Sequence, residues 1–527
     1  MKKYMFKRIL FSIFSLVVVI ACVMLLVYTA TERSVIFQMD DVWNKKSNNE
    51  RTIYEYVQYQ KYGYLEYVDY TSFLKTKYQA ALGDAYDKDE QFKADKKAIQ
   101  NAKTWMDNAS VQEFKATYEA KGYQMKYLEP IKYSSGKVKP GGTGYYVAVL
   151  EKSVFTRLGD YFAHLITFET TNDVKDEKLT DRYVRVEKDP YSGFYAVVGS
   201  GTTHKYLLFV DDHFPFIHQN WMHLNLGVSF TKYRGSEISV VICQPQGDLD
   251  VRRTQYPAQV GTDQYVDTAI DFHSVTYNYN ELTNAEKQQF NDQYTTYAYR
   301  NKGLTMLENS FVIGLIATFI AYMLGLPMGV LMSRKKDKLV DKIGNGYIIF
   351  IMAVPSLAYI FLFATIGTTL FNLPYKFANA QVKVLGYILP TISLALPSIG
   401  SLMKWMRRYM IDQMNSDYVK FARAEGMSES EIFRQHISPN AMIYLVHGIP
   451  ASILGCLTGA FITERVYAVP GVGNLLVAAL NGHDNGVIVG VTAFYTTLSI
   501  ISIILGDLLL AKYDPRISLS NDKGGGR

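Results

Sequence analysis

Apolar residues along this chain are gathered into six separate runs. The first run, Leu10 to Thr29, holds about 20 uncharged residues, and a helix of that length crosses a bilayer core of about 30 Å. A polar, Tyr-rich and charged stretch follows from Thr31 to Asn301. Five further apolar runs come after it, over residues 310–332, 347–370, 385–403, 441–462 and 487–511. Because only helices and closed barrels span lipid, the pattern predicts six transmembrane helices.

The lysines and arginines that flank these runs predict their orientation, because positively charged loops stay on the cytoplasmic side of a membrane. Basic residues precede the first run and follow the second and fourth runs: Lys2, Lys3, Lys7 and Arg8, then Arg334, Lys335, Lys336, Lys338 and Lys342, then Lys404, Arg407 and Arg408. Six spans that start inside place all three groups inside. The alternation therefore predicts both termini in the cytoplasm and residues 31–305 outside the cell.

The first run has two other interpretations, and both would remove it from the mature chain. A secretory signal peptide has a shorter apolar core and an A-x-A-like cleavage site, and the run has neither. Val19 to Cys22 is similar to a lipoprotein cleavage box, but residues 23–26 beyond it are also apolar. We therefore predict an uncleaved anchor. The expected organisation is a tail and first helix over 1–30, an extracellular domain over 31–305, a membrane core over 306–515 and a cytoplasmic tail over 516–527.

The outer segment, residues 31–305, has the pattern of an α+β domain. Aromatic and polar residues alternate from Thr52 to Phe73, as is typical of a strand, whereas residues 75–124 have a helical mixture of Ala, Lys, Asp and Glu. Glycines precede the apolar runs Tyr145–Leu150 and Tyr206–Val210, which predicts strands between about residues 130 and 245. The 41 tyrosines of the chain fit either a half-buried sheet surface, which we favour, or a docking face.

Composition narrows the class of protein further. The chain has 527 residues with 37 Gly, 15 Pro and 3 Cys, which excludes collagen-like, disulfide-stapled and disordered proteins. The formal net charge of +6 resolves into basic groups at the inner membrane surface and requires no nucleic acid partner. The sequence lacks a G-x-x-x-x-G-K-[ST] loop, an H-E-x-x-H motif and a G-x-S-x-G motif. We predict no catalytic residues, and any ATP that the function needs would bind another chain.

Histidines in the outer segment form a candidate metal site. The candidate ligands are Asp211, Asp212, His213, His218 and His223. The histidine spacing does not put ring nitrogens on one face of a helix, and a proline within the stretch disfavours a helix. We therefore favour ordinary loop and sheet histidines and predict no metal.

A candidate partner-binding segment lies between the fourth and fifth apolar runs. Residues 416–424 predict a short helix, Gly426 a stop, and Ser428 the start of a second helix. Ser428 and Glu431 have the spacing of a capping box, in which the hydroxyl and the carboxylate each satisfy a free backbone N–H. A small helical hairpin of mixed charge suits docking into a partner's groove, and a solvated loop is the alternative.

This segment resembles the permease subunits of binding-protein-dependent ABC importers, in particular their dipeptide and oligopeptide branch. The signature loop of those permeases, E-A-A-x-x-x-G-x(9)-I-x-L-P, is matched in part, by Ala422, Gly426 and Pro439. The pattern of the peptide branch, D-Y-V-x-x-A-R-A-K-G with a later His and Asn-Ala, is matched more closely. The matching residues are Asp417, Tyr418, Val419, Ala422, Arg423, Ala424, Gly426, His436, Asn440 and Ala441, with Glu425 in place of the usual Lys.

Further motifs extend the resemblance over most of residues 303–517. The family element E-x-V-F-x-x-P-G-x-G-x-L is resembled by Glu464, Val466, Pro470, Gly471, Gly473 and Leu475, with Tyr467 in place of Phe. The closing D-L-L-x(4)-D-P-R is resembled by Asp507 and residues 514–516. Residues 225–229 resemble the G-D-L-G-x-S element that precedes the second helix in the family. The outer segment would then be a family linker enlarged by insertions.

The resemblance implies a fold, a role and partners. The fold would be a polytopic α-helical membrane protein with six transmembrane helices, the ABC importer type I permease fold, with a large α+β extracellular domain inserted between helices 1 and 2. The chain would form half of the translocation path of an ATP-driven peptide importer in the cell membrane. Its partners would be a second permease, two cytoplasmic ATPases that bind ATP and Mg, and an extracellular peptide-binding lipoprotein. This chain would itself bind no cofactor.

Candidate site residues follow from the same resemblance. The hairpin, residues 416–435 within the loop 404–440, would couple to an ATPase through Asp417, Tyr418, Ala422, Arg423, Ala424, Glu425, Gly426, His436, Pro439 and Asn440. An irregular Gly-rich loop after the fifth span would form an outer gate or part of the path, with Glu464, Pro470, Gly471 and Gly473. Within the last span, Asp507 is expected to pair with a nearby base such as Lys512.

Two other classes of protein stay open as alternatives. A mechanotransmitting ABC membrane subunit has a large outer domain and no transport path, but that class usually has four spans. A membrane-anchored receptor would use its outer domain as the functional part, but it would not need five further spans with ordered motifs.

Overall fold

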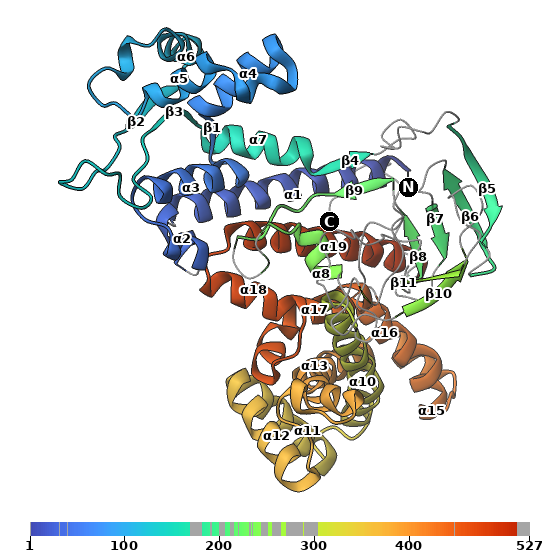
Figure 1. Cartoon of the computed structure of the whole chain (residues 1–527). Coiled ribbons are helices and arrows are strands. Elements are labelled where there is room, and N and C mark those ends of the chain that lie inside the picture. The colour runs from blue at the N-terminus through green and yellow to red at the C-terminus, as the bar shows by residue number, and fades with distance from the viewer. Residues whose placement is uncertain are drawn as a thin grey trace.

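The computed structural model of the chain is shown in Figure 1. The structure describes residues 2–30, 32–38, 40–168, 182–189, 192–199, 206–210, 216–219, 221–230, 233, 235–243, 251–255, 265–269, 288, 304–446 and 448–513.

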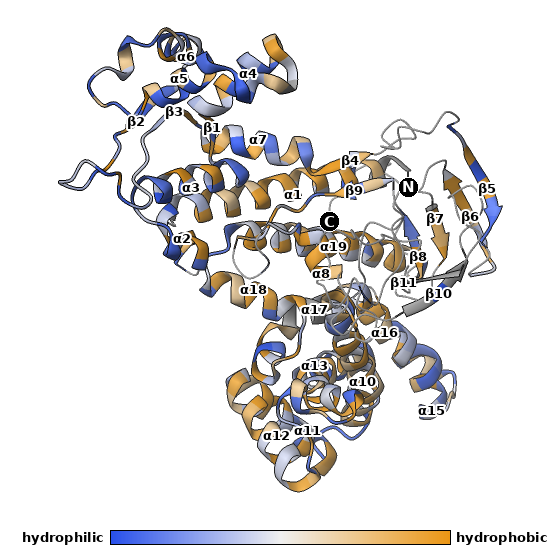
Figure 2. Ribbon diagram, in the orientation of Figure 1, coloured by the Kyte–Doolittle hydropathy of each residue, from blue (hydrophilic) through white to orange (hydrophobic). Residues whose placement is uncertain are grey.

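Within the described residues, five helices are long and apolar enough to cross a membrane, or six if a bent pair counts as one span. The five are α1 (Lys2–Ala30), α10 (Met306–Arg334), α13 (Lys383–Met414), α17 (Ile449–Tyr467) and α19 (Asn485–Tyr513). Each overlaps one of the apolar runs of the sequence. Figure 2 shows hydrophobic residues along these helices and more hydrophilic ones over α3 to α6.

The third apolar run is not one straight helix. α11 (Leu339–Ala353) and α12 (Ser356–Phe371) meet at a bend of 113°. Proline disfavours helical backbone at the residue before it, and Val354, which precedes Pro355, is extended with φ −81° and ψ 129°. The apolar run over residues 347–370 therefore forms part of a bent pair of helices, and the predicted count of six spans holds only if this pair is one span.

Small residues let α10 and α13 approach each other closely. A Cβ added to Gly325 would lie 2.8 Å from Leu402 Cβ, and one added to Gly329 would lie 2.7 Å from Met406 Cβ. Such a four-residue spacing of small residues is typical of helix contacts in membranes. Around this contact, α10, α12, α13 and α17 share a buried core that includes Ile313, Ala317, Ala321, Ile360, Leu389, Met403 and Tyr467.

α1 packs along α19, and the two helices share a second core. Ile20 of α1 and Val491 of α19 belong to one cluster of buried residues. Arg8 Nη2 lies 2.9 Å from Asp507 Oδ2. The sequence prediction named Lys512 as the partner of Asp507, and the structure places Arg8 at that carboxylate. The packing of two helices far apart in the chain brings this ion pair together.

The first part of the outer segment is built on a three-stranded antiparallel sheet. Across the sheet the strands are β1 (Leu65–Asp69), β3 (Tyr145–Glu151) and β2 (Gln124–Leu128). Alternate residues of β3 face opposite sides of the sheet. Tyr146 packs on the side covered by α4 (Tyr70–Leu82), α5 (Glu90–Ala98) and α6 (Ala109–Glu119). Val147 packs on the other side, which α3 (Asn48–Lys61) covers.

The alternation of aromatic residues between residues 52 and 73 is mostly helical, because α3 occupies residues 48–61. Tyr56 stacks on Tyr67 of the sheet, with ring centroids 5.9 Å apart. Tyr54 instead packs in a cluster with Phe37 on another face of α3. A helix that buries aromatic rings on two faces gives a sequence pattern that resembles a strand, and this prediction was wrong for that reason.

The second part of the outer segment begins with α7 (Val154–His164), which lies along α1 in Figure 1. Its Leu158 and Phe162 pack against the core that α1 and α19 share. In the described residues that follow there are three small sheets: β4 (Ile166–Phe168) with β9 (Met222–Leu224), the four strands β5 (Val184–Lys188), β6 (Tyr195–Gly199), β7 (Tyr206–Val210) and β8 (Ile217–Gln219), and β10 (Val251–Gln255) with β11 (Tyr265–Ala269). The strands predicted at Tyr145 and Tyr206 are confirmed as β3 and β7.

Candidate functional site

The helical hairpin that the sequence predicted is present after α13. It consists of α14 (Asp417–Ala424) and α15 (Glu429–Glu431), which continues as a π-helical stretch over Ile432–Ile437 and as α16 (Ser438–Val446). Gly426 has φ +85°, a left-handed conformation that glycine adopts without strain, and it ends α14. Both bonds of the Ser428–Glu431 capping box are formed. Local sequence signals therefore located both helices correctly.

One face of the hairpin packs on the C-terminal end of α13. Val419 and Ile432 are buried in a cluster with Met406 and Met410 of α13. Ala422 belongs to the same cluster. The contact holds the hairpin to α13 as one body.

Hydrogen bonds bring three of the predicted coupling residues together. The Tyr418 hydroxyl donates to Gln413 Oε1 at 2.7 Å and to the carbonyl of His436 at 3.3 Å. Asn440 Nδ2 donates to the same carbonyl at 2.7 Å. These side chains brace the hairpin from inside, a role that their sequence pattern alone did not reveal.

The opposite face of the hairpin is exposed, and it carries the remaining predicted coupling residues: Asp417, Arg423, Ala424, Glu425, Gly426 and Pro439. Phe421 stands among them with 71% of its surface exposed. Arg423 Nε lies 2.6 Å from Glu429 Oε1, and this bond lowers the pKa of the Glu429 carboxyl. An exposed aromatic ring that is surrounded by paired charged side chains forms a surface that a protein partner can cover.

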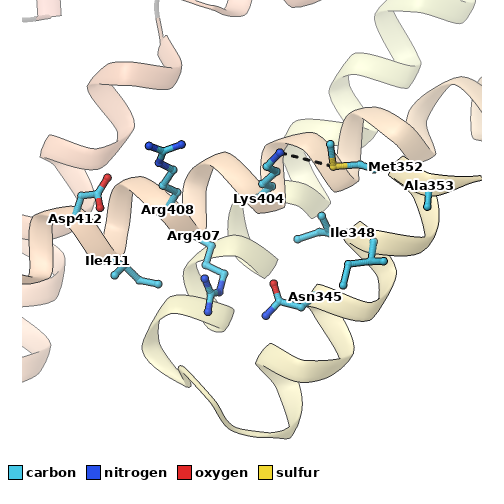
Figure 3. Close-up of a pocket in the computed structure, with 10 residues that line it drawn as sticks. Asn345, Ile348, Met352, Ala353, Lys404, Arg407, Arg408, Ile411 and Asp412 are labelled. Atoms are coloured by element: carbon cyan, nitrogen blue, oxygen red, sulfur yellow. Dashed lines mark hydrogen bonds between the residues drawn. The ribbon is translucent and has the colours of Figure 1, made fainter.

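A groove of about 670 Å³ opens between α11 and α13 near the hairpin. Figure 3 shows Lys404 and Arg408 on α13, and Arg407 turned toward α11. Arg407 makes a bidentate ion pair with the buried Asp341 of α11, at 2.6 and 2.7 Å. This pair fastens α11 to α13, so the basic end of α13 has a structural role.

A cavity of about 380 Å³ lies between α10, α12, α13 and α17. Its lining is rich in hydroxyl groups, from Thr318, Tyr322, Ser356, Tyr359, Ser393, Ser398, Ser401, Ser452 and Thr463. The sequence reasoning did not single out these residues. On α13 the cavity is lined by Ser393, Pro397 and Ser401, which recur every fourth residue within an apolar run, and that periodicity was the available signal.

The predicted outer-gate residues are brought together at the start of α18 (Val472–Asn481). Glu464 is fully buried, and its carboxylate accepts hydrogen bonds from Ser310 Oγ at 2.7 Å and from the backbone N–H of Asn474 at 3.0 Å. A Cβ on Gly471 would lie 2.3 Å from Glu464 Oε2, and one on Gly473 would lie 2.8 Å from it. Both positions must be small for the carboxylate to reach the start of the helix.

Much of the stretch predicted as an irregular loop is helical, because α18 begins at Val472. The carbonyl of Pro470 accepts a bond from Asn309 Nδ2 of α10 at 3.0 Å. Glu464 of α17 caps α18, because its carboxylate accepts a hydrogen bond from the N–H of Asn474 in the first turn of that helix. Gly471 and Gly473 had suggested a loop. The structure shows instead that these two positions lack a side chain because the buried Glu464 carboxylate lies against them.

A second carboxylate, that of Asp484, holds the end of the segment 225–229, which resembles the family element that precedes the second helix. Asp484, at the start of α19, accepts hydrogen bonds from Ser229 Oγ at 2.7 Å and from the N–H of Phe230 at 2.9 Å. Gly486 allows close approach, since a Cβ there would lie 2.0 Å from the carbonyl of Val228. The sequence did not single out Asp484, because its partners lie far away in the chain.

The candidate metal ligands are separated in the described residues. His218 lies on β8 and His223 on β9, which belong to different sheets. Asp211, Asp212 and His213 lie outside the described residues. Among the residues that the structure describes, no group of three His, Cys, Asp or Glu side chains is placed to hold a metal ion.

Comparison with known proteins adds an independent line of information. Residues 325–519 match the family model of binding-protein-dependent transport system inner membrane components. The oligopeptide transport system permease protein AmiC of Streptococcus pneumoniae serotype 4 is 34% identical over 538 residues, and the alignment covers all of both chains. The dipeptide transport system permease protein DppB of Bacillus subtilis is 30% identical over 212 residues, 40% of this chain and 68% of that protein. DppB of Lactococcus lactis subsp. cremoris is 30% identical over 233 residues, 43% of this chain and 75% of that protein.

Proposed function

Since the chain belongs to the permease family of binding-protein-dependent ABC importers, we propose that it forms one half of the membrane path of a peptide importer. The peptide substrate is inferred from an oligopeptide permease that matches the whole chain and from a dipeptide permease that matches 40% of it. The mechanotransmitting subunit and the receptor are not favoured by these relatives.

The observation that carries the proposal is the continuity of α13 from the hairpin to the hydroxyl-lined cavity. α13 has 32 residues, a length of about 48 Å. Met410 near its C-terminal end packs in the core of the hairpin, and Ser393 and Ser401 nearer its middle line the cavity. A displacement of the hairpin is therefore passed to the cavity along one helix.

An ATP-hydrolysing partner would drive this displacement. The exposed face of the hairpin, which includes Phe421, would rest in a groove of the partner. A partner whose nucleotide-bound and nucleotide-free forms contact the hairpin differently would favour different tilts of α13. ATP and Mg would bind the two partner ATPases, and this chain would bind no cofactor.

The chemistry of the cavity suits a peptide of variable sequence. Serine and threonine hydroxyls can both donate and accept hydrogen bonds, which matches the N–H and C=O groups of a peptide backbone. None of the described residues that line the cavity carries a formal charge. The cavity would therefore contact features common to all peptides, while a second permease would complete the path on the open side.

The proposed topology places the hairpin and both termini in the cytoplasm and the α+β outer segment outside the cell membrane, with six spans when α11 and α12 count as one. α18 and its cap at Glu464 would then lie at the outer end of the path, where they could act as a gate beneath a docked peptide-binding lipoprotein. The basic residues after α10 and along α13 support this orientation.

Two substitutions at comparable glycines test the coupling role of the hairpin. Gly426 and Gly136 both have positive φ, +85° and +81°, and at both a Cβ would meet open space. Arginine at either position therefore adds similar backbone strain, but only Gly426 lies in the hairpin. Gly426→Arg should abolish peptide uptake at normal membrane abundance, and Gly136→Arg should leave uptake near the wild-type level. Normal uptake and normal ATPase association in Gly426→Arg would refute the coupling role.

Purification from native membranes tests the wider assembly. Two ATPases, a second permease and a peptide-binding lipoprotein should accompany the chain. If the chain is recovered alone under conditions that preserve membrane complexes, a receptor becomes the better interpretation.

A further inference from the structure

A polar cavity lies where the outer segment meets the membrane helices. Its volume is about 300 Å³. Residues of three helices line it: Tyr28 of α1, Arg157 and Tyr161 of α7, and Gly486 of α19. Lys61, at the end of α3, lines it as well. The site is distinct from the hydroxyl-lined cavity and from the hairpin.

Arg157 is the unusual residue of this cavity, because only 7% of its surface is exposed. Its guanidinium carbon lies 3.5 Å from the ring centroid of Tyr28 and 3.8 Å from that of Tyr64. The faces of the two aromatic rings stabilise the cation, and the Arg157 side chain also forms a hydrogen bond with Tyr28. Nη2 is buried and has no hydrogen-bond partner among the described residues.

The acidic groups around the cavity are bonded to other residues. Asp160 Oδ2 lies 2.7 Å from Lys152 Nζ. Asp484 accepts from Ser229 and Phe230. In the described part of the chain, no carboxylate forms an ion pair with Arg157, and the buried Tyr161 hydroxyl also has no hydrogen-bond partner.

A buried cation and a buried hydroxyl with free hydrogen-bonding capacity both lower the stability of a protein unless a ligand satisfies them. The guanidinium edge is shaped for a planar carboxylate or for two oxygens of a phosphate. Lys61 adds a second positive charge at the cavity wall, while the single acid of the lining, Asp160, is neutralised by Lys152. The charge of the cavity therefore complements an anion.

We propose that this cavity binds an anionic group, a phosphate or a carboxylate, through the side chains of Arg157 and Tyr161, whose buried polar atoms turn toward the bound group, with Lys61 nearby. The group comes either from the headgroup of an anionic phospholipid or from a free anion. Because α1, α7 and α19 all line the cavity, the bound anion fastens the outer segment to the first and last membrane helices. This binding site does not depend on the proposed transport function.

Thermal unfolding of the full-length chain in a neutral detergent tests the proposal. Probes are sodium phosphate and sodium acetate at constant ionic strength, and phosphatidylglycerol against phosphatidylcholine. At least one anionic probe should raise the melting temperature of the wild-type chain in a saturable way. Arg157→Gln should weaken the apparent affinity for that probe by about tenfold or more, the loss expected for a charge-assisted hydrogen bond.

Arg51→Gln is the matched control. Arg51 also stacks on an aromatic ring, 4.4 Å from the centroid of Trp43, but it does not line the cavity. It should keep the full response to the anion. A response to phosphatidylglycerol alone identifies a lipid headgroup, and a response to phosphate or acetate identifies a free anion.

The proposal is overturned if no anionic probe stabilises the wild-type chain, or if Arg157→Gln responds as the wild type does. Arg157 would then be a cation held only by its two tyrosine rings. Should Arg157→Gln fail to fold, Lys61→Gln decides the matter, because Lys61 is exposed and its substitution is expected to leave the fold intact. Lys61→Gln should weaken the apparent affinity about two- to fivefold, and an unchanged affinity would count against the site.

Discussion

Replacing Gly473 by alanine should disrupt the start of α18. The added Cβ would lie 2.3 Å from Phe461 Cδ1 and 2.8 Å from Glu464 Oε2, and the Phe461 Cα is also only 2.8 Å away. Because one of these contacts is with backbone, relief requires α18 to move away from α17. Such overpacking costs about 1–3 kcal/mol.

The same movement would separate the Glu464 carboxylate from the N–H of Asn474, now 3.0 Å away. Loss of a buried hydrogen bond that leaves its partner unsatisfied costs about 1–3 kcal/mol. The higher helix propensity of alanine returns about 1 kcal/mol. We therefore expect Gly473→Ala to lower the free energy of unfolding by about 1–5 kcal/mol.

Unfolding of the purified chain by SDS titration in mixed micelles measures this change. Gly346→Ala is the control, because Gly346 also lies within a helix, α11, but a Cβ there would meet no atom within 4 Å. The control should be as stable as the wild type or slightly more stable. If Gly473→Ala unfolds at the same SDS fraction as Gly346→Ala, the steric account of the Gly-rich motif is wrong.

Three further results are expected. Asp341→Asn should destabilise the chain by about 2–4 kcal/mol in the same SDS titration. This loss is smaller than that for breaking a fully buried ion pair, because the Arg407 side chain is 22% exposed. The double variant with Asp341→Asn and Arg407→Met should recover part of the lost stability. Burial raises the pKa of Asp95, but hydrogen bonds led by those of Asn108 and Ser110 outweigh it and hold this pKa below 3.8. The stability that these bonds contribute is full well above pH 3.8 and is lost as the pH falls through the folded value, so near-UV circular dichroism should show an acid transition that is absent in Asp95→Asn. Ser401→Leu should fill part of the hydroxyl-lined cavity and reduce peptide uptake at normal membrane abundance. Ser401→Ala should leave uptake unchanged. Equal uptake by the two variants would show that the cavity is not part of the translocation path.

Features that depend on neighbours in the sequence could be predicted from it. The hairpin is an example, because the left-handed turn at Gly426 and the capping box at Ser428 involve residues at most three positions apart. The apolar runs are another, since the length of a run alone meets the thickness of a bilayer. Pro355 is also a local signal in the sequence, and it lies at the bend between α11 and α12.

Contacts between distant segments could not be predicted in the same way. The sequence marked Glu464, Gly471 and Gly473 as a motif, but only the packing of α17 against α18 shows that the glycines make room for a buried carboxylate. Arg8 reaches Asp507 only because α1 packs along α19.

The amino-acid sequence by itself determined the number of apolar segments and the local structure of the hairpin, because hydropathy and capping act over a few residues. Tertiary structure alone decided which polar groups become partners. Arg157, for instance, lies between Tyr28 and Tyr64, which are more than 90 positions away from it in the chain. The physical reason is that burial in a low-dielectric interior depends on the packing of whole helices, and no short stretch of sequence specifies that packing.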